Sequence, residues 1–190
     1  MQLIPSPADA PIALVGMMGA GKTSVGRRLA ARLQRTFIDA DRELEARCGV
    51  PVATIFDLEG EDGFRRREAA LIDELTQRVG IVLATGGGAV VRAESRDRLR
   101  ERAFVVYLRA TAHEVWLRTR RDRSRPLLQT ANPRARIAEL IAARDPLYGE
   151  TASIVVETGR QPIEQVVAAI IDRLPAPLAA PWPGDAQPPG

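Results

Sequence analysis

The sequence predicts an α/β layered fold built on a parallel sheet. Short apolar runs of strand length alternate along the chain with stretches whose apolar residues recur at helical spacing. The first run, residues 12–15, leads into a glycine-rich loop and then into a segment where Val25, Leu29 and Leu33 share one helical face. A chain of 190 residues is long enough for one domain with a core of its own.

The apolar runs and the stretches with helical spacing give the expected positions of the individual strands and helices. The five expected strands are residues 12–15, 36–39, 81–84, 104–108 and 153–156. The expected helices are residues 22–33, 42–47, 52–56, 64–78, 92–102, 112–121, 134–143 and 163–174. Gly49 and Pro51 separate the two short helices after the second strand, and Pro146 limits the helix that begins at residue 134.

The two ends of the chain are expected to lie outside the domain. Residues 1–10 are polar and contain proline, and we expect them to be flexible. Residues 11–174 are expected to form the single domain. Residues 175–190 are rich in proline and have no periodicity, so we expect a disordered tail. The sequence leaves open whether Trp182, within this tail, docks on the surface.

Composition excludes several classes of protein. The formal net charge is +3, aromatic residues make up 4%, and most arginines alternate with acids, as in residues 92–102. We read these arginines as a solvated helix face and expect no nucleic-acid partner. One cysteine and one histidine cannot form an internal disulfide or a Cys/His zinc site. No apolar run is long enough to predict a membrane span, and residues 1–10 lack a secretory pattern, so the cytoplasm is the expected compartment.

Residues 16–23 read Gly-Met-Met-Gly-Ala-Gly-Lys-Thr and fit the phosphate-binding pattern G-x-x-x-x-G-K-[ST]. Lys22 is the only lysine among 27 Lys and Arg residues, so the compact ammonium is kept where it reaches β- and γ-phosphates. The loop amides and the helix N-terminus would hold phosphate oxygens, and the Thr23 hydroxyl would bind Mg²⁺. The strand before the loop, the helix after it and the lone lysine disfavour a chance match.

This loop does not identify the reaction, because ATPases, GTPases and small-molecule kinases share it. A guanine-specific switch protein needs an Asn-Lys-x-Asp motif, which a chain with Lys22 as its only lysine cannot contain. Residues 57–60 imitate the Asp-x-x-Gly of GTPases but do not follow a strand, so we regard that match as coincidence.

Two further features lie at the carboxyl ends of expected strands, where open α/β sheets bind ligands. Asp39 and Asp41 could order Mg²⁺ water or accept a hydroxyl proton. Alternatively, Asp41 could merely cap the next helix, and the residues alone leave both readings open. The run Gly86, Gly87 and Gly88 would let a ligand approach the backbone, although taken alone it favours a plain turn.

Any single arginine of this chain is expected to be a surface charge, because arginines are so numerous. Residues 118–125 differ, since they combine many arginines with few apolar residues between two expected helices. That composition suits a mobile lid over phosphates. His113, just before this segment, is expected to lie on the surface.

Six motifs together carry a resemblance to a known family. They are residues 16–23, Phe-x-Asp-x-Asp at 37–41, Glu-x-x-Phe-Arg-x-x-Glu at 61–68, Thr-Gly-Gly-Gly-Ala-Val at 85–90, Arg-Pro-Leu-Leu at 125–128 and Arg-x-Pro-Leu-Tyr at 144–148. In this order the chain resembles the shikimate kinase family, over about residues 11–174. The resemblance implies a three-layer P-loop kinase fold similar to that of nucleoside monophosphate kinases, with a five-stranded parallel sheet, an acceptor-binding region at about 41–70 and a mobile lid at about 116–128.

The resemblance also implies an activity and a set of roles. The activity is ATP-dependent phosphorylation of the shikimate 3-hydroxyl, a step toward chorismate and the aromatic amino acids, by a monomer. The implied nucleotide-binding residues are Gly19, Ala20, Gly21, Lys22, Thr23, Ser24, Arg118, Arg125 and Arg160. The implied acceptor-binding residues are Asp41, Arg65, Gly87, Gly88 and Arg144. Lys22, Asp41 as the candidate base, and Arg125 on the lid would be catalytic. Thr23 would ligate Mg²⁺ directly, and Asp39 through water.

Two rival functions remain at this point. A related kinase, such as a gluconate kinase, would share the phosphate loop and fold. The paired arginines and the glycine run favour instead a ring carboxylate with vicinal hydroxyls. A regulatory protein that binds ATP without transferring its phosphate is the second rival, and the full set of acceptor-site residues argues against it.

Overall fold

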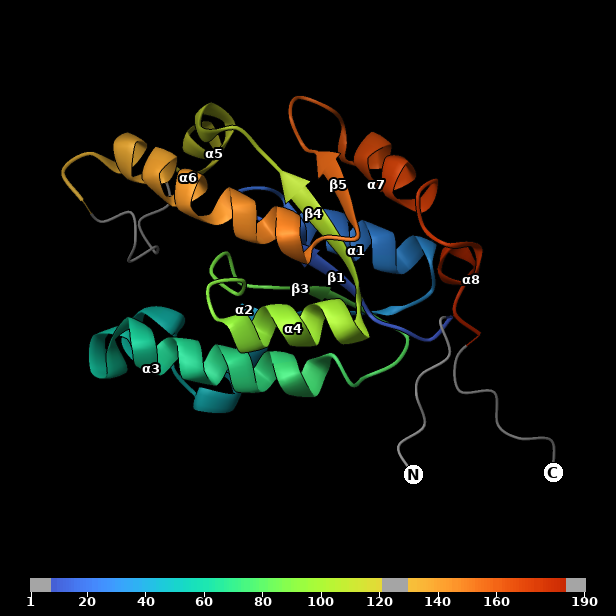
Figure 1. Ribbon diagram of the computed structural model, residues 1–190, viewed down its shortest axis with the longest axis horizontal. Helices are drawn as coiled ribbons and strands as arrows, with labels where there is room; N and C mark the ends of the chain where they lie inside the picture. The colour runs from blue at the N-terminus through green and yellow to red at the C-terminus, as the bar shows by residue number, and fades with distance from the viewer. Residues whose placement is uncertain (1–7, 121–129, 184–190) are drawn as a thin grey trace.

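Five parallel strands form one sheet in the computed structural model, which describes residues 8–120 and 130–183 (Figure 1). The strands are β1 Ile12–Val15, β2 Thr36–Asp39, β3 Ile81–Ala84, β4 Phe104–Arg109 and β5 Ile154–Glu157. Their spatial order is β2-β3-β1-β4-β5, and every neighbouring pair is parallel. The expected α/β fold with a five-stranded parallel sheet is therefore confirmed.

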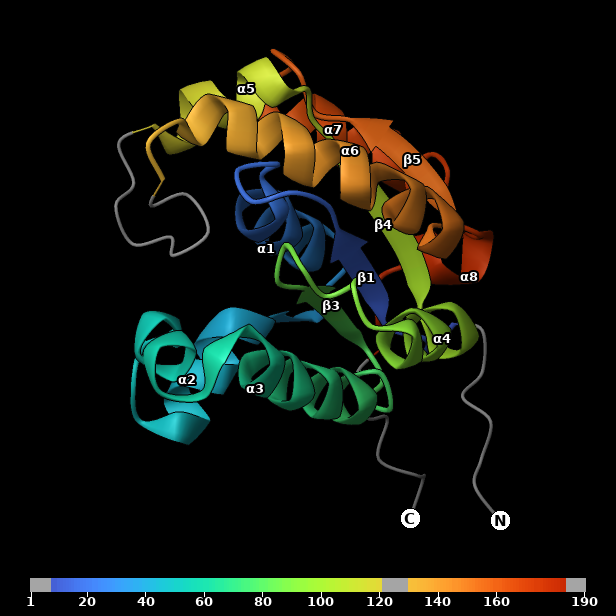
Figure 2. The same cartoon turned by 60° about the vertical axis from the view of Figure 1, so that its left-hand side comes forward.

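Helices cover both faces of this sheet (Figure 2). They are α1 Lys22–Arg32, α2 Ala40–Cys48, α3 Val52–Leu75, α4 Ala93–Arg102, α5 Ala112–Thr119, α6 Pro133–Thr151, α7 Ile163–Ile171 and α8 Ala176–Ala179. α1 packs beside α7 on one face, whereas α4 lies between α3 and α6 on the other. None of the described helices is both long and apolar enough to cross a membrane.

The core explains why the strands read as continuous apolar runs. β1 and β3 are buried along their whole length, as expected for parallel strands covered on both sides. A second, smaller cluster joins α2 and α3 to the edge of the sheet. Its buried members are Ala40, Leu44, Ile55, Phe64, Leu71, Leu75, Ile81 and Leu83. An apolar cluster of its own thus holds the lobe formed by α2 and α3 against the sheet.

α3 consists of two helical segments that meet at a kink, which agrees with the two helices expected from the sequence. Residues 52–75 form one helical run, bent at Gly60, where φ is 70° and ψ is 179°. A residue with a side chain rarely adopts this backbone conformation, so the glycine marks the bend. The expected break between residues 56 and 64 is therefore present, at Gly60.

The expected end of the helix near Pro146 is wrong. α6 continues through Pro146 to Thr151, although proline removes one helical hydrogen bond. Burial of the following turn offsets that loss, because Tyr148 and Thr151 are both buried. The Thr151 hydroxyl also donates to the carbonyl of Leu147 at 2.6 Å. Tertiary packing here outweighs a local helix breaker.

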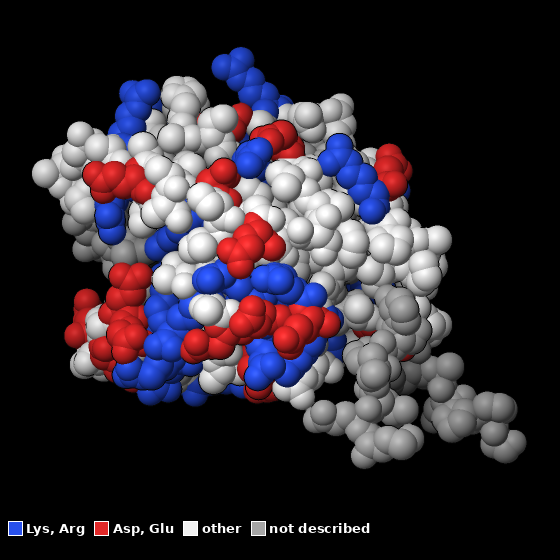
Figure 3. Space-filling view, in the orientation of Figure 1, with Lys and Arg blue, Asp and Glu red and all other residues white. Residues whose placement is uncertain are grey.

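Arginines and acids alternate across the surface of α3 and α4 (Figure 3). Arg98 and Arg102 of α4 both pair with Asp73 of α3 at 2.9 Å, and Arg100 pairs with Glu150 of α6 at 3.3 Å. Exposed pairs of this kind contribute little stability each. The reading of residues 92–102 as a solvated helix face is confirmed.

The expectation of a disordered tail is wrong for residues 175–183. α8 buries Leu178 in the main core, and the Trp182 amide donates to the carbonyl of Leu33 at 2.7 Å. The Trp182 indole lies against Gly80 and 5.6 Å from the Arg35 guanidinium carbon. Arg35 in turn donates to the carbonyls of Ala8 and Ala10. Residues 8–10 are therefore also held in place, while residues 1–7 and 184–190 lie outside the described part of the chain.

Replacing Trp182 with alanine should lower the free energy of unfolding by about 1–3 kcal/mol, because a partly buried ring and its contact with Arg35 are lost. Urea unfolding followed by circular dichroism measures this change. Pro183→Ala, at an exposed neighbouring position, is the matched control. Equal stability of the two variants would show that the Trp182 contact contributes nothing.

Candidate active site

The phosphate-binding loop joins β1 to α1 at the carboxyl edge of the sheet (Figure 2). Lys22 is buried and donates from Nζ to the carbonyls of Gly16 at 2.7 Å and Met17 at 2.9 Å. Gly21 precedes α1 without a side-chain cap, and no acidic residue occupies the first turn. The amides at this helix start are therefore available for an anion such as phosphate.

Thr23 and Asp39 meet beside this loop. The Thr23 hydroxyl donates to Asp39 Oδ2 at 2.7 Å, which brings two oxygen ligands together. Mg²⁺ typically takes one or two protein oxygens and draws its other ligands from water and phosphates, so this pair fits it. Among the described residues no cluster of three or more His, Cys, Asp or Glu could hold a metal by itself.

Asp39, rather than Asp41, caps the helix that follows β2. Asp39 Oδ1 accepts from the Arg42 amide at 3.4 Å, and α2 begins at Ala40. The alternative in which Asp41 serves as the cap is therefore wrong. Asp41 lies inside the first turn and its side chain lines a pocket.

That pocket, called here the central pocket, has a volume of about 490 Å³ and opens between the sheet edge, α2 and α3. It is lined by residues that include Met18, Asp39, Asp41, Phe56, Phe64, Arg65, Glu68, Gly86, Gly87, Gly88 and Arg144. All five residues expected to bind an acceptor line it, together with Asp39 and one residue of the phosphate loop. The rings of Phe56 and Phe64, 4.5 Å apart, supply an apolar wall.

Arg65 and Glu68 form a buried pair on the wall of the central pocket. They are 6% and 3% exposed, and Arg65 Nη1 donates to Glu68 Oε2 at 2.6 Å. Arg65 Nη2 also donates to Glu61 at 3.2 Å. Two buried atoms of the pair, Arg65 Nε and Glu68 Oε1, have no protein partner. Such atoms are costly to bury without a partner.

The glycine run leaves room for this pair. A Cβ at Gly86 would lie 2.3 Å from Glu68 Oε1, and one at Gly88 would lie 2.1 Å from Arg65 Nη2. Gly87 lies against the phosphate loop, since its Cβ would be 3.1 Å from the Met18 amide nitrogen. The run is therefore more than a flexible turn, because any larger residue at its first or last position would displace a charged side chain.

Burial raises the pKa of Asp41, while the ammonium of Lys22 acts in the opposite direction. Burial likewise raises the pKa of Glu68, against the lowering effect of Arg65. A carboxylate with a raised pKa is a stronger base once ionised. Asp41 therefore lines the central pocket in surroundings that raise the pKa of its carboxyl group.

Arg144 enters the central pocket from α6. It is 5% exposed, and Nη1 donates to the Gly87 carbonyl at 3.2 Å. The Tyr148 hydroxyl, one helical turn later, donates to the same carbonyl. Arg144 and Arg65 thus both line the central pocket.

The expected nucleotide residues lie along the phosphate loop and beside it. Arg118 donates to the carbonyls of Gly19 at 3.0 Å and Gly159 at 2.7 Å, so it joins the loop to the segment after β5. Ser24 and Arg160 are exposed on these same segments. Arg125 and most of the expected lid, residues 116–128, lie outside the described residues.

Sequence reasoning missed two residues of this site. Glu68 belongs to the motif at 61–68 and lies one helical turn from Arg65, so its spacing could have predicted the pair. Tyr148 likewise follows Arg144 by four residues in the motif at 144–148. In both cases the signal was helical spacing from an assigned arginine.

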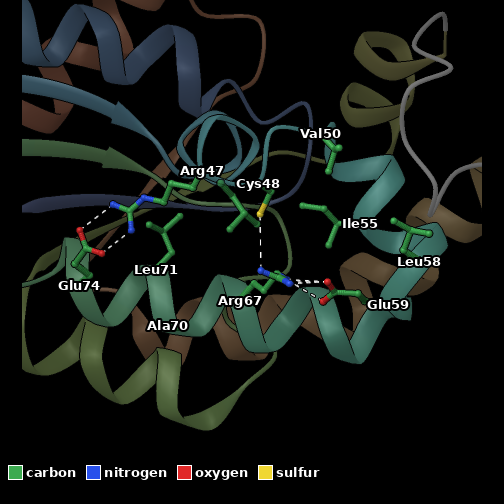
Figure 4. A pocket seen from close by; sticks show the side chains of 11 residues that line it. Arg47, Cys48, Val50, Ile55, Leu58, Glu59, Arg67, Ala70, Leu71 and Glu74 are labelled. Atoms are coloured by element: carbon green, nitrogen blue, oxygen red, sulfur yellow. Dashed lines mark hydrogen bonds and ion pairs between the residues drawn. The ribbon is translucent and has the colours of Figure 1, made fainter.

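A second pocket, of about 350 Å³, lies on the outer side of the α2–α3 lobe (Figure 4). Its arginines already have partners, because Arg47 pairs with Glu74 at 2.6 Å and Arg67 with Glu59 at 2.6 Å. Cys48 lies 3.9 Å from Arg67 Nη1. None of the expected site residues lines this outer pocket, so it does not compete with the central pocket as the active site.

Comparison with known proteins agrees with this geometry. A family model described as shikimate kinase matches residues 18–175. Shikimate kinase of Bordetella pertussis is 61% identical over 170 residues, which cover 90% of this chain and 81% of that protein. A solved structure of shikimate kinase from Acinetobacter baumannii in complex with shikimate has a TM-score of 0.84 and 46% identity, covering 86% of this chain and 91% of that one.

A more distant structure, a gluconokinase from Sinorhizobium meliloti, has a TM-score of 0.55 and 21% identity, covering 90% of this chain and 92% of that one. At this identity only the fold is shared. The family model covers residues 18–175, and the relatives named above are 46% and 61% identical to this chain. The chain belongs to the shikimate kinase family.

Proposed function

We propose that this protein transfers the γ-phosphoryl group of ATP to the 3-hydroxyl of shikimate, giving shikimate 3-phosphate and ADP on the route to chorismate and the aromatic amino acids. The observation that carries the proposal is the central pocket. Two buried arginines, a carboxylate and a glycine floor surround a space beside the phosphate loop. A carboxylate-bearing ring with hydroxyl groups complements each of these features.

Arg65 and Arg144 bind the acceptor carboxylate in this proposal. Their planar guanidinium groups can each offer paired donors to its two oxygens. Glu68 holds Arg65 in place, and Gly87 and Gly88 form the floor of the ring site. Asp41 contacts the hydroxyls and accepts the proton of the attacking one, as its raised pKa supports.

Lys22, Thr23 and the backbone of residues 19–24 hold the donor phosphates. Thr23 directly, and Asp39 through water, would hold Mg²⁺, which would supply positive charge against the phosphates. Arg118 and Arg160 border the adenine in this proposal, and the role proposed for Arg125, a contact with the transferred phosphate, falls on a residue outside the described part of the chain. Phosphoryl transfer needs little covalent chemistry from the protein, so these groups act by position and charge.

One chain supplies every proposed acceptor residue, which supports a monomer as the working unit. The need for ATP supports the cytoplasm as its compartment. The gluconate kinase alternative shares the fold, but the combination of two buried arginines with a glycine floor suits a carboxylate on a ring.

The activity is tested by ADP release with ATP, Mg²⁺ and one of three acceptors: shikimate, gluconate or a nucleoside monophosphate. Only shikimate should be turned over. Turnover of another acceptor with shikimate inert would refute the proposal. Tight ATP binding without transfer to any of the three would favour a regulatory protein.

Arg65→Ala or Arg144→Ala should each weaken shikimate binding by about 1.5–3 kcal/mol, the scale of a hydrogen bond to a charged group, and leave KM for ATP unchanged. Steady-state kinetics measure both constants. Arg66→Ala is the matched control, because Arg66 is exposed and pairs with Asp62. The variant Arg65→Ala/Glu68→Gln avoids an unpaired buried carboxylate, so it separates lost binding from lost folding. An equal loss of ATP affinity would remove the arginines from the acceptor site.

Lys22→Met should lower kcat by about 100-fold or more, because one preorganised charge on the phosphates is lost. The fold should stay intact, because methionine fills most of the same space, although the hydrogen bonds to the Gly16 and Met17 carbonyls are lost. Circular dichroism and ADP release on one preparation provide the comparison. Activity close to that of the parent protein would show that Lys22 does not perform its assigned role.

A further inference from the structure

Two side chains of α6 share one acceptor atom at the edge of the central pocket. Arg144 and Tyr148 are four residues apart, so they lie on the same helical face. Arg144 Nη1 and the Tyr148 hydroxyl both donate to the Gly87 carbonyl. Tyr148 is 1% exposed, and its hydroxyl lies 3.6 Å from the sulfur of Met17 in the phosphate loop.

The phenol of Tyr148 is held firmly in this position. Its ring stacks on Tyr107 of β4 with centroids 4.9 Å apart. The Tyr107 hydroxyl donates to Asp145 at 2.6 Å, and Arg109 donates to the same carboxylate at 3.2 and 3.3 Å. Tyr148 is therefore backed by a polar network that ends at the surface, while its own hydroxyl points to the pocket floor.

Arg144 and the Tyr148 hydroxyl are expected to behave differently when the phosphoryl acceptor binds. Under the proposed function, Arg144 turns its donors to the carboxylate of shikimate. Gly87 O would then lose one of its two partners. A carbonyl that is left without a hydrogen bond away from water costs free energy. The Tyr148 hydroxyl, as the second donor, therefore determines how easily Arg144 can leave the Gly87 carbonyl.

We propose that Tyr148 is a positioning residue for acceptor binding, whose hydroxyl keeps the Gly87 carbonyl bonded while Arg144 turns to the acceptor carboxylate. The inference rests on the proposed function. It assigns Tyr148 no contact with the acceptor itself. Its effect therefore appears in carboxylate binding and not in phosphoryl transfer or ATP binding.

Tyr148→Phe tests this inference, because it keeps the stacked ring and removes only the hydroxyl. KM for shikimate should rise about five-fold, the effect of losing one neutral hydrogen bond, whereas kcat and KM for ATP should stay within about two-fold. Tyr107→Phe is the matched control, since it removes a hydroxyl from the same stack that does not touch Gly87. It should leave KM for shikimate unchanged.

A second measurement separates this role from general loosening of the pocket. Shikimate methyl ester lacks the negative charge that recruits Arg144. Calorimetric titration should show that Tyr148→Phe weakens binding of shikimate about five-fold and binding of the ester little. Equal weakening of both ligands, or an unchanged KM for shikimate, would overturn the inference. If the parent protein fails to phosphorylate shikimate, the proposed function itself falls, so the two failures are distinguishable.

Discussion

The burial of two guanidinium groups is the constraint on which the central pocket depends. Arg65 and Arg144 are 6% and 5% exposed, and a charge removed from water needs partners within the protein. Glu68 supplies a carboxylate to Arg65, and the Gly87 carbonyl accepts from Arg144. Glycines on both sides of Gly87 leave the space these side chains occupy. The glycine run and the buried glutamate are thus consequences of the same requirement.

The sheet order brings this pocket to the phosphate loop. β1 lies between β3 and β4, so the loops that follow β1 and β3 meet at one edge. The contact is close, because a Cβ at Gly87 would lie 3.1 Å from the Met18 amide nitrogen. A donor phosphate on the first loop and an acceptor on the second are therefore neighbours. For phosphoryl transfer, which relies on alignment and charge neutralisation, this proximity is the main contribution of the fold.

The parts of the structure that the sequence predicted well depend on local periodicity or on motifs. The five strands and the residues that gather at the sheet edge belong to this class. The errors arose where distant contacts decide the outcome. α6 passes Pro146 because Tyr148 and Thr151 are buried beyond it. The segment around Trp182 is ordered because the Trp182 ring contacts Arg35 and Gly80, which are far away in the sequence. No pattern within either segment carries that information.

The two arginines of the central pocket, Arg65 and Arg144, differ in their charged partners. Arg65 is balanced by Glu68, a charged partner it can keep while other donors bind a ligand. Among the described residues no ion pair gives Arg144 a carboxylate, and its neighbour Asp145 is engaged by Arg109. The Glu68 carboxylate offsets part of the charge of both arginines, and it offsets more of the charge of Arg65, which it contacts. Under the proposed function, Arg65 would therefore orient the ligand, whereas Arg144, which no ion pair among the described residues joins to a carboxylate, would attract the ligand carboxylate more strongly.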